Sequence, residues 1–134
     1  MSTAKTLLCA CMFALLATPV IVSAFVPEDL EKLKKENKCP GCDLRGVNLS
    51  GAVLNDASLE GANLMGANLT GAQLKSAVLE DASLEKALLK NANLHGSSLD
   101  HATIDEADFS GADLEDAVWI DGRMCKKGSV GVCK

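Results

Sequence analysis

The chain has no tyrosine, and aromatic residues make up only 3% of its 134 positions. A core built around aromatic rings is therefore excluded. The 48% of residues that are hydrophobic must form a mainly aliphatic core instead. A chain of this length supports one small domain.

Basic residues are scarce in the long central part of the chain. Residues 42–121 contain fourteen acidic residues and four basic ones, whereas residues 25–41 are balanced and residues 122–134 carry four bases and no acid. The body is therefore acidic and ends in a small basic tail. An acidic surface has the wrong sign for contact with phosphates, so the composition excludes direct binding of nucleic acid.

The first 24 residues have the features of an export signal. Lys5 precedes an apolar run over residues 7–22, and small residues close the segment at Ser23 and Ala24. We expect cleavage after Ala24, and the expected location is the periplasm, a lumen or the extracellular space, without membrane contact. An uncleaved membrane anchor is the alternative, although the run is short and contains Pro19.

Four cysteines remain after removal of the signal: Cys39, Cys42, Cys125 and Cys133. An even number of cysteines in an exported chain predicts two disulfides. Their connectivity does not follow from the spacing alone.

The central part of the sequence repeats every five residues. In a register centred on Leu64, sixteen consecutive units over residues 42–121 have Leu at the centre, replaced in three units by Ile, Phe or Trp. Ala occurs two residues before the centre in thirteen of these units. Such regularity predicts a repeat architecture.

A period of five fits neither a helix nor a long straight strand. Five residues advance an α-helix by about 500°, which spreads successive centres around its axis. An odd period in a strand sends alternate centres to opposite faces. The pattern favours short extended segments separated by two-residue corners. Seven units have Gly at the second corner position, which indicates positive φ at these corners. Most other units have Asp, Ser, Glu, Lys or His at that position. We therefore predict that the corners cannot all be type II turns, which require positive φ at this position.

The units follow the motif A-(D/N)-L-x-x, as in Ala62-Asn63-Leu64, Ala67-Asn68-Leu69, Ala92-Asn93-Leu94 and Ala112-Asp113-Leu114. In these units the chain closely resembles the pentapeptide-repeat family, over 80 of its 134 residues. The resemblance implies an all-β fold, a right-handed quadrilateral parallel β-helix with four units in each of about four coils. Residues twenty apart would then stack, with a spacing of about 4.8 Å between strands.

Both flanks of the repeat are predicted to cap the coil, because open strand edges would promote end-to-end growth. Residues 25–41 have apolar residues at helical spacing with acids early and lysines late, which indicates a short helical cap. A solvated leader is the alternative. Residues 122–134 are predicted to form a folded C-terminal cap. In the repeat register Cys39 and Cys42 point inward across one corner, where they could bridge, and Cys125 with Cys133 would close a second loop.

The segment Cys39-Pro40-Gly41-Cys42 also has the spacing of a redox dithiol, which would make the protein a thiol oxidoreductase. Redox dithiols of that kind open a helix, whereas this one opens the repeat, so we interpret it as structural. A zinc site of four cysteines is rejected because the two pairs are expected at opposite ends of a stem about 19 Å long.

His95 and His101 are the only histidines, and both fall at outward corners without a pocket. We therefore predict no enzymatic activity, no cofactor and no metal centre.

Stacking the units in fours brings one group of corner residues onto a single edge. This group, named the acidic edge, comprises Glu60, Glu80, Asp81, Asp100, His101 and Asp121. Carboxylates about 4.8 Å apart could weakly share a divalent cation such as Ca²⁺ or contact a basic partner. A solvated edge that keeps the rod soluble is the simpler interpretation.

The sequence thus predicts a non-enzymatic exported structural or protein-binding module, and it does not identify the protein partner. The resemblance also implies an alternative, an acidic rod that mimics duplex DNA and binds DNA gyrase, which requires a cytosolic protein. This chain departs from such relatives in its export signal and its short stem, and neither a dimerising C-terminal helix nor a projecting loop is evident.

Overall fold

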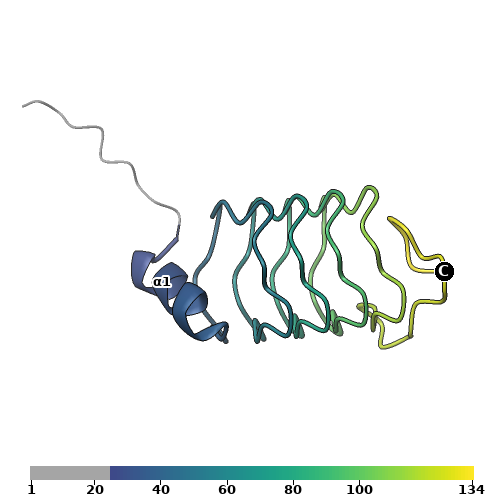
Figure 1. Ribbon diagram of the computed structural model, residues 1–134, viewed down its shortest axis with the longest axis horizontal. Helices are drawn as coiled ribbons and strands as arrows, with labels where there is room; N and C mark the ends of the chain where they lie inside the picture. Colours follow the sequence, from purple (N-terminus) through teal and green to yellow (C-terminus); the bar gives the residue numbers. More distant parts are fainter. Residues whose placement is uncertain (1–24) are drawn as a thin grey trace, which may run out of the picture.

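The computed structural model describes residues 25–134, and the predicted signal at residues 1–24 lies outside the described residues. Within the described residues, a single helix, α1 (Pro27–Glu36), precedes a stack of coils, and a short C-terminal segment closes the other end (Figure 1). Within residues 25–134, no helix has the length and apolar character needed to cross a membrane.

The coils are held together by single-residue bridges between extended segments. Thirteen parallel bridges all join residues twenty apart, beginning with Lys38 and Ser58 and ending with Ser98 and Val118. Each turn of the chain therefore takes twenty residues, or four units. The first bridge lies four residues before the predicted start of the repeat at residue 42, so the ladder begins inside the segment predicted as the N-terminal cap.

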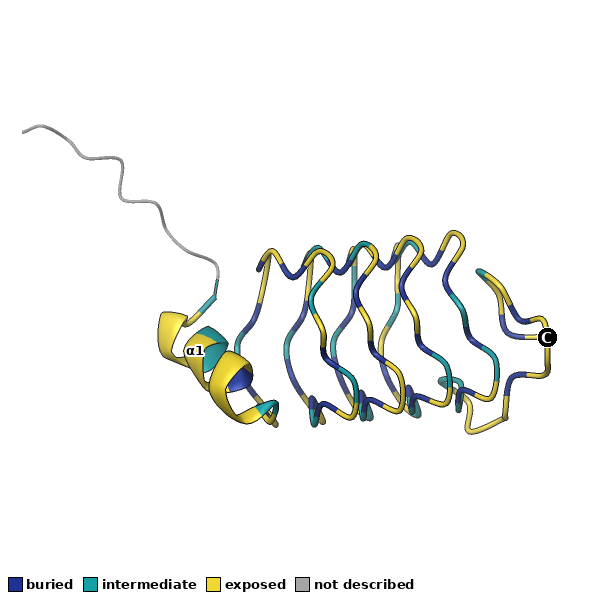
Figure 2. Ribbon diagram, in the orientation of Figure 1, coloured by how far each residue is buried: buried dark blue, intermediate teal, exposed yellow. Residues whose placement is uncertain are grey.

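The repeated Ala and Leu positions face inward and form the core. All thirteen leucine centres are buried, with exposed fractions of 6% or less. The residue between Ala and Leu points the other way, so buried and more exposed residues alternate along each segment (Figure 2). In the last coil Phe109 and Trp119 replace leucine, and their rings pack edge to face at 5.4 Å.

The corners share one backbone feature in fifteen of the sixteen units. In these fifteen units the second corner residue has positive φ. The exception is Asp121, in the last unit. Positive φ was indicated for the Gly corners, and it also occurs at seven positions without Gly or Asn: Asp56, Ser76, Asp81, Lys86, His101, Glu106 and Asp116.

Hydrogen bonding explains why these unfavourable residues are accepted. At every corner the next N–H bonds back to the carbonyl of the centre, as Ala82 does to Leu79 at 3.1 Å. At five of the seven positions the second corner N–H also bonds to the neighbouring coil, as Asp81 does to Asp100 at 3.0 Å, and at Asp116 it bonds to the Cys125 carbonyl of the C-terminal segment. These bonds offset a left-handed conformation that costs about 1–2 kcal/mol outside Gly.

Helix α1 covers the first coil, as the helical pattern predicted. Leu33 is buried against the coil, and the Val26 N–H donates to the Asp43 carbonyl at 3.0 Å. Acids in the first turn and lysines in the last complement the helix dipole. Asn37 ends the helix in the left-handed conformation, with its N–H on the Leu33 carbonyl at 2.9 Å.

The C-terminal segment covers the last coil by antiparallel pairing. Val130 bridges Asp113, and Met124 bridges Val118. The Leu114 N–H also donates to the Ser129 carbonyl at 2.9 Å. Two sides of the last coil, those containing Asp113 and Val118, are thereby paired rather than left open.

Candidate functional site

Each predicted cysteine pair forms a disulfide within its own end of the molecule. Cys39 bonds to Cys42 with 5.4 Å between their Cα atoms, and Cys125 bonds to Cys133 with 4.9 Å. Helix α1 and the C-terminal segment lie at opposite ends of the coil (Figure 1). The four sulfurs therefore do not surround one metal position.

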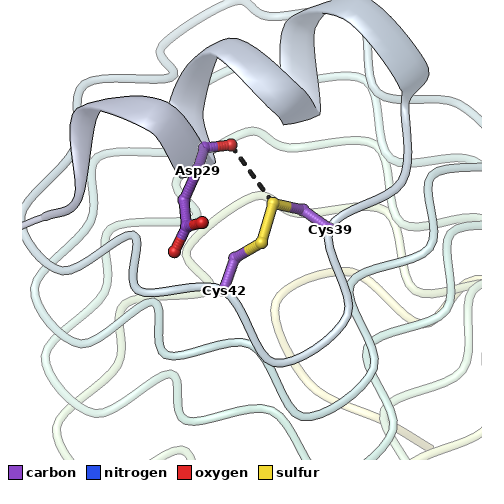
Figure 3. A group of neighbouring side chains, drawn as sticks. All are labelled: Asp29, Cys39 and Cys42. Atoms are coloured by element: carbon purple, nitrogen blue, oxygen red, sulfur yellow. Dashed lines mark hydrogen bonds between the residues drawn. A yellow bond between two sulfur atoms is a disulfide. The ribbon is translucent and has the colours of Figure 1, made fainter.

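The first disulfide is buried beneath α1. Cys39 is 0% and Cys42 is 5% exposed. Cys39 Sγ lies 3.1 Å from the backbone carbonyl oxygen of Asp29, the contact drawn in Figure 3. A disulfide sulfur has no proton to donate, so this is a close contact of α1 with the bridge. Thiol exchange needs access of an attacking thiolate to a sulfur, and the helix restricts that access.

The acidic edge is assembled by the ladder between coils. The Gly61 N–H donates to the Glu80 carbonyl at 2.8 Å, and the Asp81 N–H donates to the Asp100 carbonyl at 3.0 Å. These bonds place the first corner residues Glu60, Glu80 and Asp100 on successive coils. Glu60 and Asp81 are exposed, whereas Glu80 and Asp100 are half-buried.

Three carboxylates of the acidic edge already have partners. Glu80 accepts a hydrogen bond from the Ser98 hydroxyl at 2.8 Å, and Asp100 lies 3.2 Å from His101 Nδ1. Asp121 pairs with Arg123 at 3.3 Å. In the described part of the chain, Glu60 and Asp81 are the two acids of this edge whose carboxylates make no hydrogen bond or ion pair.

The acidic edge does not gather the ligand atoms for a cation. Among residues 25–134, groups of three side chains with mutually close ligand atoms occur at two other places. One of them combines Asp29 with Cys39 and Cys42. These two sulfurs form a disulfide, whereas metal ions bind the thiolate form of cysteine. The structure therefore lends no support to the predicted cation sharing along the acidic edge.

The second group was missed by the sequence analysis. It consists of His95, Glu115 and Asp116, whose ligand atoms all lie within 4.8 Å of one another. His95 and Glu115 occupy the same corner position twenty residues apart. Comparison of corner residues twenty apart predicted the acidic edge. The same comparison at positions 95 and 115 would have predicted this pair.

A carboxylate with a displaced pKa lies at the opposite end, near α1. The Arg45 guanidinium donates to both oxygens of Asp43, at 2.8 and 2.6 Å. This side-chain hydrogen bonding lowers the pKa of Asp43, and it raises the pKa of Arg45. The Ser110 hydroxyl and N–H lower the pKa of Asp108 in the same way.

A cleft of about 310 Å³ lies between α1 and the first coil. Its lining combines apolar residues with amides, one hydroxyl and one lysine, and comprises Leu33, Lys34, Asn37, Asn48, Leu49, Ser50, Ala52, Val53 and Leu54. None of these described residues is an acid, a histidine or a cysteine. The cleft therefore offers no carboxylate or imidazole as a general base and no thiol nucleophile.

Comparison with known proteins agrees with the architecture. Eight copies of the pentapeptide-repeat pattern match within residues 42–81 and 77–116, which together cover more than half of the chain. No curated protein sequence matches the chain at a significant level.

Solved structures of pentapeptide-repeat proteins resemble the chain. One from Nostoc is 32% identical, with 69% of this chain and 78% of that one covered and a TM-score of 0.63. One from the thylakoid lumen of Arabidopsis thaliana is 28% identical, with 60% and 63% covered and a TM-score of 0.35. One from Cyanothece is 28% identical, with 67% and 82% covered and a TM-score of 0.34. The repeat match and the Nostoc structure identify the coil as a right-handed β-helix, and the chain belongs to the pentapeptide-repeat family.

Proposed function

We propose that the chain is an exported, non-enzymatic protein-binding module, a four-sided rod of about four coils that acts in the periplasm, a lumen or the extracellular space. Its acidic edge is the proposed contact surface, and the expected partner has a basic surface. Export itself rests on the sequence of residues 1–24 and on the paired cysteines.

One observation carries the proposal. The inward positions of the coils are filled with buried Ala and Leu, so the polar side chains of the coil lie almost entirely on its outside, in columns twenty residues apart. A rigid rod with regularly spaced outer side chains is suited to recognising an extended surface, as other solenoids do.

The side chains that could take part in catalysis are poorly placed to act on a substrate. The buried Cys39–Cys42 disulfide has little access for an attacking thiolate. His101 pairs with Asp100 on an exposed corner, where no walls orient a substrate or exclude water. These features favour binding over catalysis.

Within the acidic edge, Glu60 and Asp81 are the best placed to meet a partner. Both are exposed, and a second protein would not have to break existing contacts of their carboxylates. Rim charges of this kind mainly set the association rate and its salt dependence. Binding through them should therefore weaken as salt concentration rises.

The test is affinity capture from the exported fraction of the native cells, followed by binding measurements with the purified partner. The baits are the wild type, Glu60→Lys/Asp81→Lys, and the charge-matched control Asp56→Lys/Glu106→Lys. The control residues are also exposed corner acids. The proposal predicts a partner that the wild type and the control retain and that the acidic-edge variant loses.

Two outcomes would overturn the proposal. If all three baits retain the same partner with equal affinity at every salt concentration, the acidic edge is not the contact surface. If the purified protein reduces or isomerises a disulfide substrate, and Cys39→Ser/Cys42→Ser abolishes that activity, the protein is a thiol oxidoreductase.

A further inference from the structure

A second outer corner carries a different chemistry from the acidic edge. His95 follows the buried Leu94, and Glu115 and Asp116 follow Leu114 one coil later. The Gly96 N–H donates to the Glu115 carbonyl at 2.9 Å, which joins the two corners. These three residues, His95, Glu115 and Asp116, are named the His95 cluster.

The side chains of the His95 cluster are close enough to meet at one ion. Their ligand atoms lie within 4.8 Å of one another, and His95 Nε2 lies 3.8 Å from an Asp116 carboxylate oxygen. Two donors each about 2.1 Å from one zinc ion are separated by at most about 4.2 Å. Small rotations of these partly exposed side chains are therefore sufficient to close the cluster around an ion.

Both corners of the cluster are held in the same conformation. The His95 N–H donates to Asn93 Oδ1 at 3.1 Å, and the Glu115 N–H donates to Asp113 Oδ1 at 3.0 Å. Asn93 and Asp113 are themselves bridged across the coils. The backbone thus fixes the spacing between the ligand-bearing residues. Binding of an ion therefore costs less conformational entropy.

The C-terminal cap orients one of the carboxylates. The Gly128 N–H donates to Glu115 Oε2 at 3.3 Å. The Asp116 N–H donates to the Cys125 carbonyl at 3.0 Å, so the neighbouring backbone is also attached to the cap. Hydrogen bonds of this kind to a ligating carboxylate are common around metal centres.

The ligand set selects the class of ion. One imidazole nitrogen and two carboxylates suit Zn²⁺, whereas Ca²⁺ and Mg²⁺ prefer oxygen ligands throughout. The side chains of His95 and Asp116 are 34% and 60% exposed, which leaves room for a water molecule as a fourth ligand. On this geometry we propose that the His95 cluster binds one Zn²⁺ ion and that the ion ties the last two coils together beside the C-terminal cap.

The other histidine provides a matched control. His101 Nδ1 lies 3.2 Å from an Asp100 carboxylate oxygen, so both histidines have an acidic neighbour. Within residues 25–134, His101 is not part of a three-ligand group. A zinc site should therefore depend on His95 and be insensitive to His101.

The test is calorimetric titration of ZnCl₂ into the purified, tag-free protein near neutral pH, in a buffer that does not bind zinc. We expect saturable binding of one ion and a rise in the melting temperature. His95→Ala should abolish saturable binding, Glu115→Gln and Asp116→Asn should each weaken it about tenfold or more, and His101→Ala should leave it unchanged.

A second readout separates ligation from an effect on folding. In ¹⁵N-correlated spectra of the two imidazoles, Zn²⁺ should shift the His95 nitrogens and leave those of His101 in place. The proposal fails if the wild type gives no saturable heat, because His95 and Asp116 would then be neighbouring side chains without a bound ion. It also fails if His95→Ala binds as tightly as the wild type, or if His101→Ala loses binding to the same extent as His95→Ala.

Discussion

Asp29 in α1 and Asp43 in the first coil are joined by a hydrogen bond of 2.8 Å, in which the Asp43 N–H donates to the Asp29 carboxylate. A second hydrogen bond attaches the start of the helix to the same residue, since the Val26 N–H donates to the Asp43 carbonyl. Asp43 thus uses both of its backbone polar groups in this region to attach the helical cap. The cap protects the buried disulfide and the first leucines of the core.

Replacing Asp29 should loosen this attachment. Asp29→Ala should lower the free energy of unfolding by about 1.5–3 kcal/mol, the range for a hydrogen bond to a charged group. Urea denaturation is the measurement, with the exposed Glu28→Ala in the same helical turn as the control. Equal effects of the two substitutions would show that the Asp29 contact does not hold the cap.

Two adjacent leucines provide a direct test of the inward and outward register. Leu89 is 0% exposed, and Leu88 is 44% exposed. Leu89→Ala should cost about 2–5 kcal/mol because it leaves a cavity in the packed column. Leu88→Ala should cost much less, and denaturant melts of both variants can be compared. A larger loss for Leu88→Ala would contradict the register.

The corner conformation can be tested at Gly66, which has a φ of +66° and free space where a Cβ would lie. Gly66→Ala should destabilise the protein by about 1 kcal/mol through its backbone conformation alone. Ser76 already has a Cβ at a φ of +57°, so Ser76→Ala is the control. Thermal unfolding should show a loss for the first variant and little change for the second. A comparable loss in both would rule out backbone conformation as the cause.

The Asp43–Arg45 pair predicts a specific acid titration. The hydrogen bond from Arg45 lowers the pKa of Asp43 below its ordinary value of 3.8. Because the folded-state pKa is the lower one, the pair stabilises the fold above the unfolded-state pKa, and this contribution is lost as pH falls through the folded-state pKa. In carbon-detected NMR titrations, Arg45→Gln should raise the pKa of Asp43 and leave that of Asp108 low. An unchanged Asp43 titration would contradict the assignment.

Much of the fold could be predicted because one physical rule repeats without interruption. Leu64 and Ala62 must face inward together, and a five-residue period allows this only with a corner in every unit. The corner conformations were harder to predict, because propensity disfavours positive φ at Lys86 or His101. The ladder between coils fixes the backbone at such positions.

The outer surface was less predictable than the core. Stacking in fours placed Glu80 and Asp100 on one edge, but their contacts with Ser98 and His101 depend on rotamers. His95 was treated as an isolated outward residue because its neighbours Glu115 and Asp116 are about twenty residues away in the sequence. A solenoid brings such distant residues together at every turn, and each column has to be followed separately.

The central claim, an exported binding module, is tested most directly by intact mass spectrometry of the protein isolated from fractionated native cells. The account predicts a mature chain beginning at Phe25, found outside the cytosol, with no cysteine open to alkylation before reduction. A full-length cytosolic protein with free thiols would contradict it and would favour the gyrase-binding alternative.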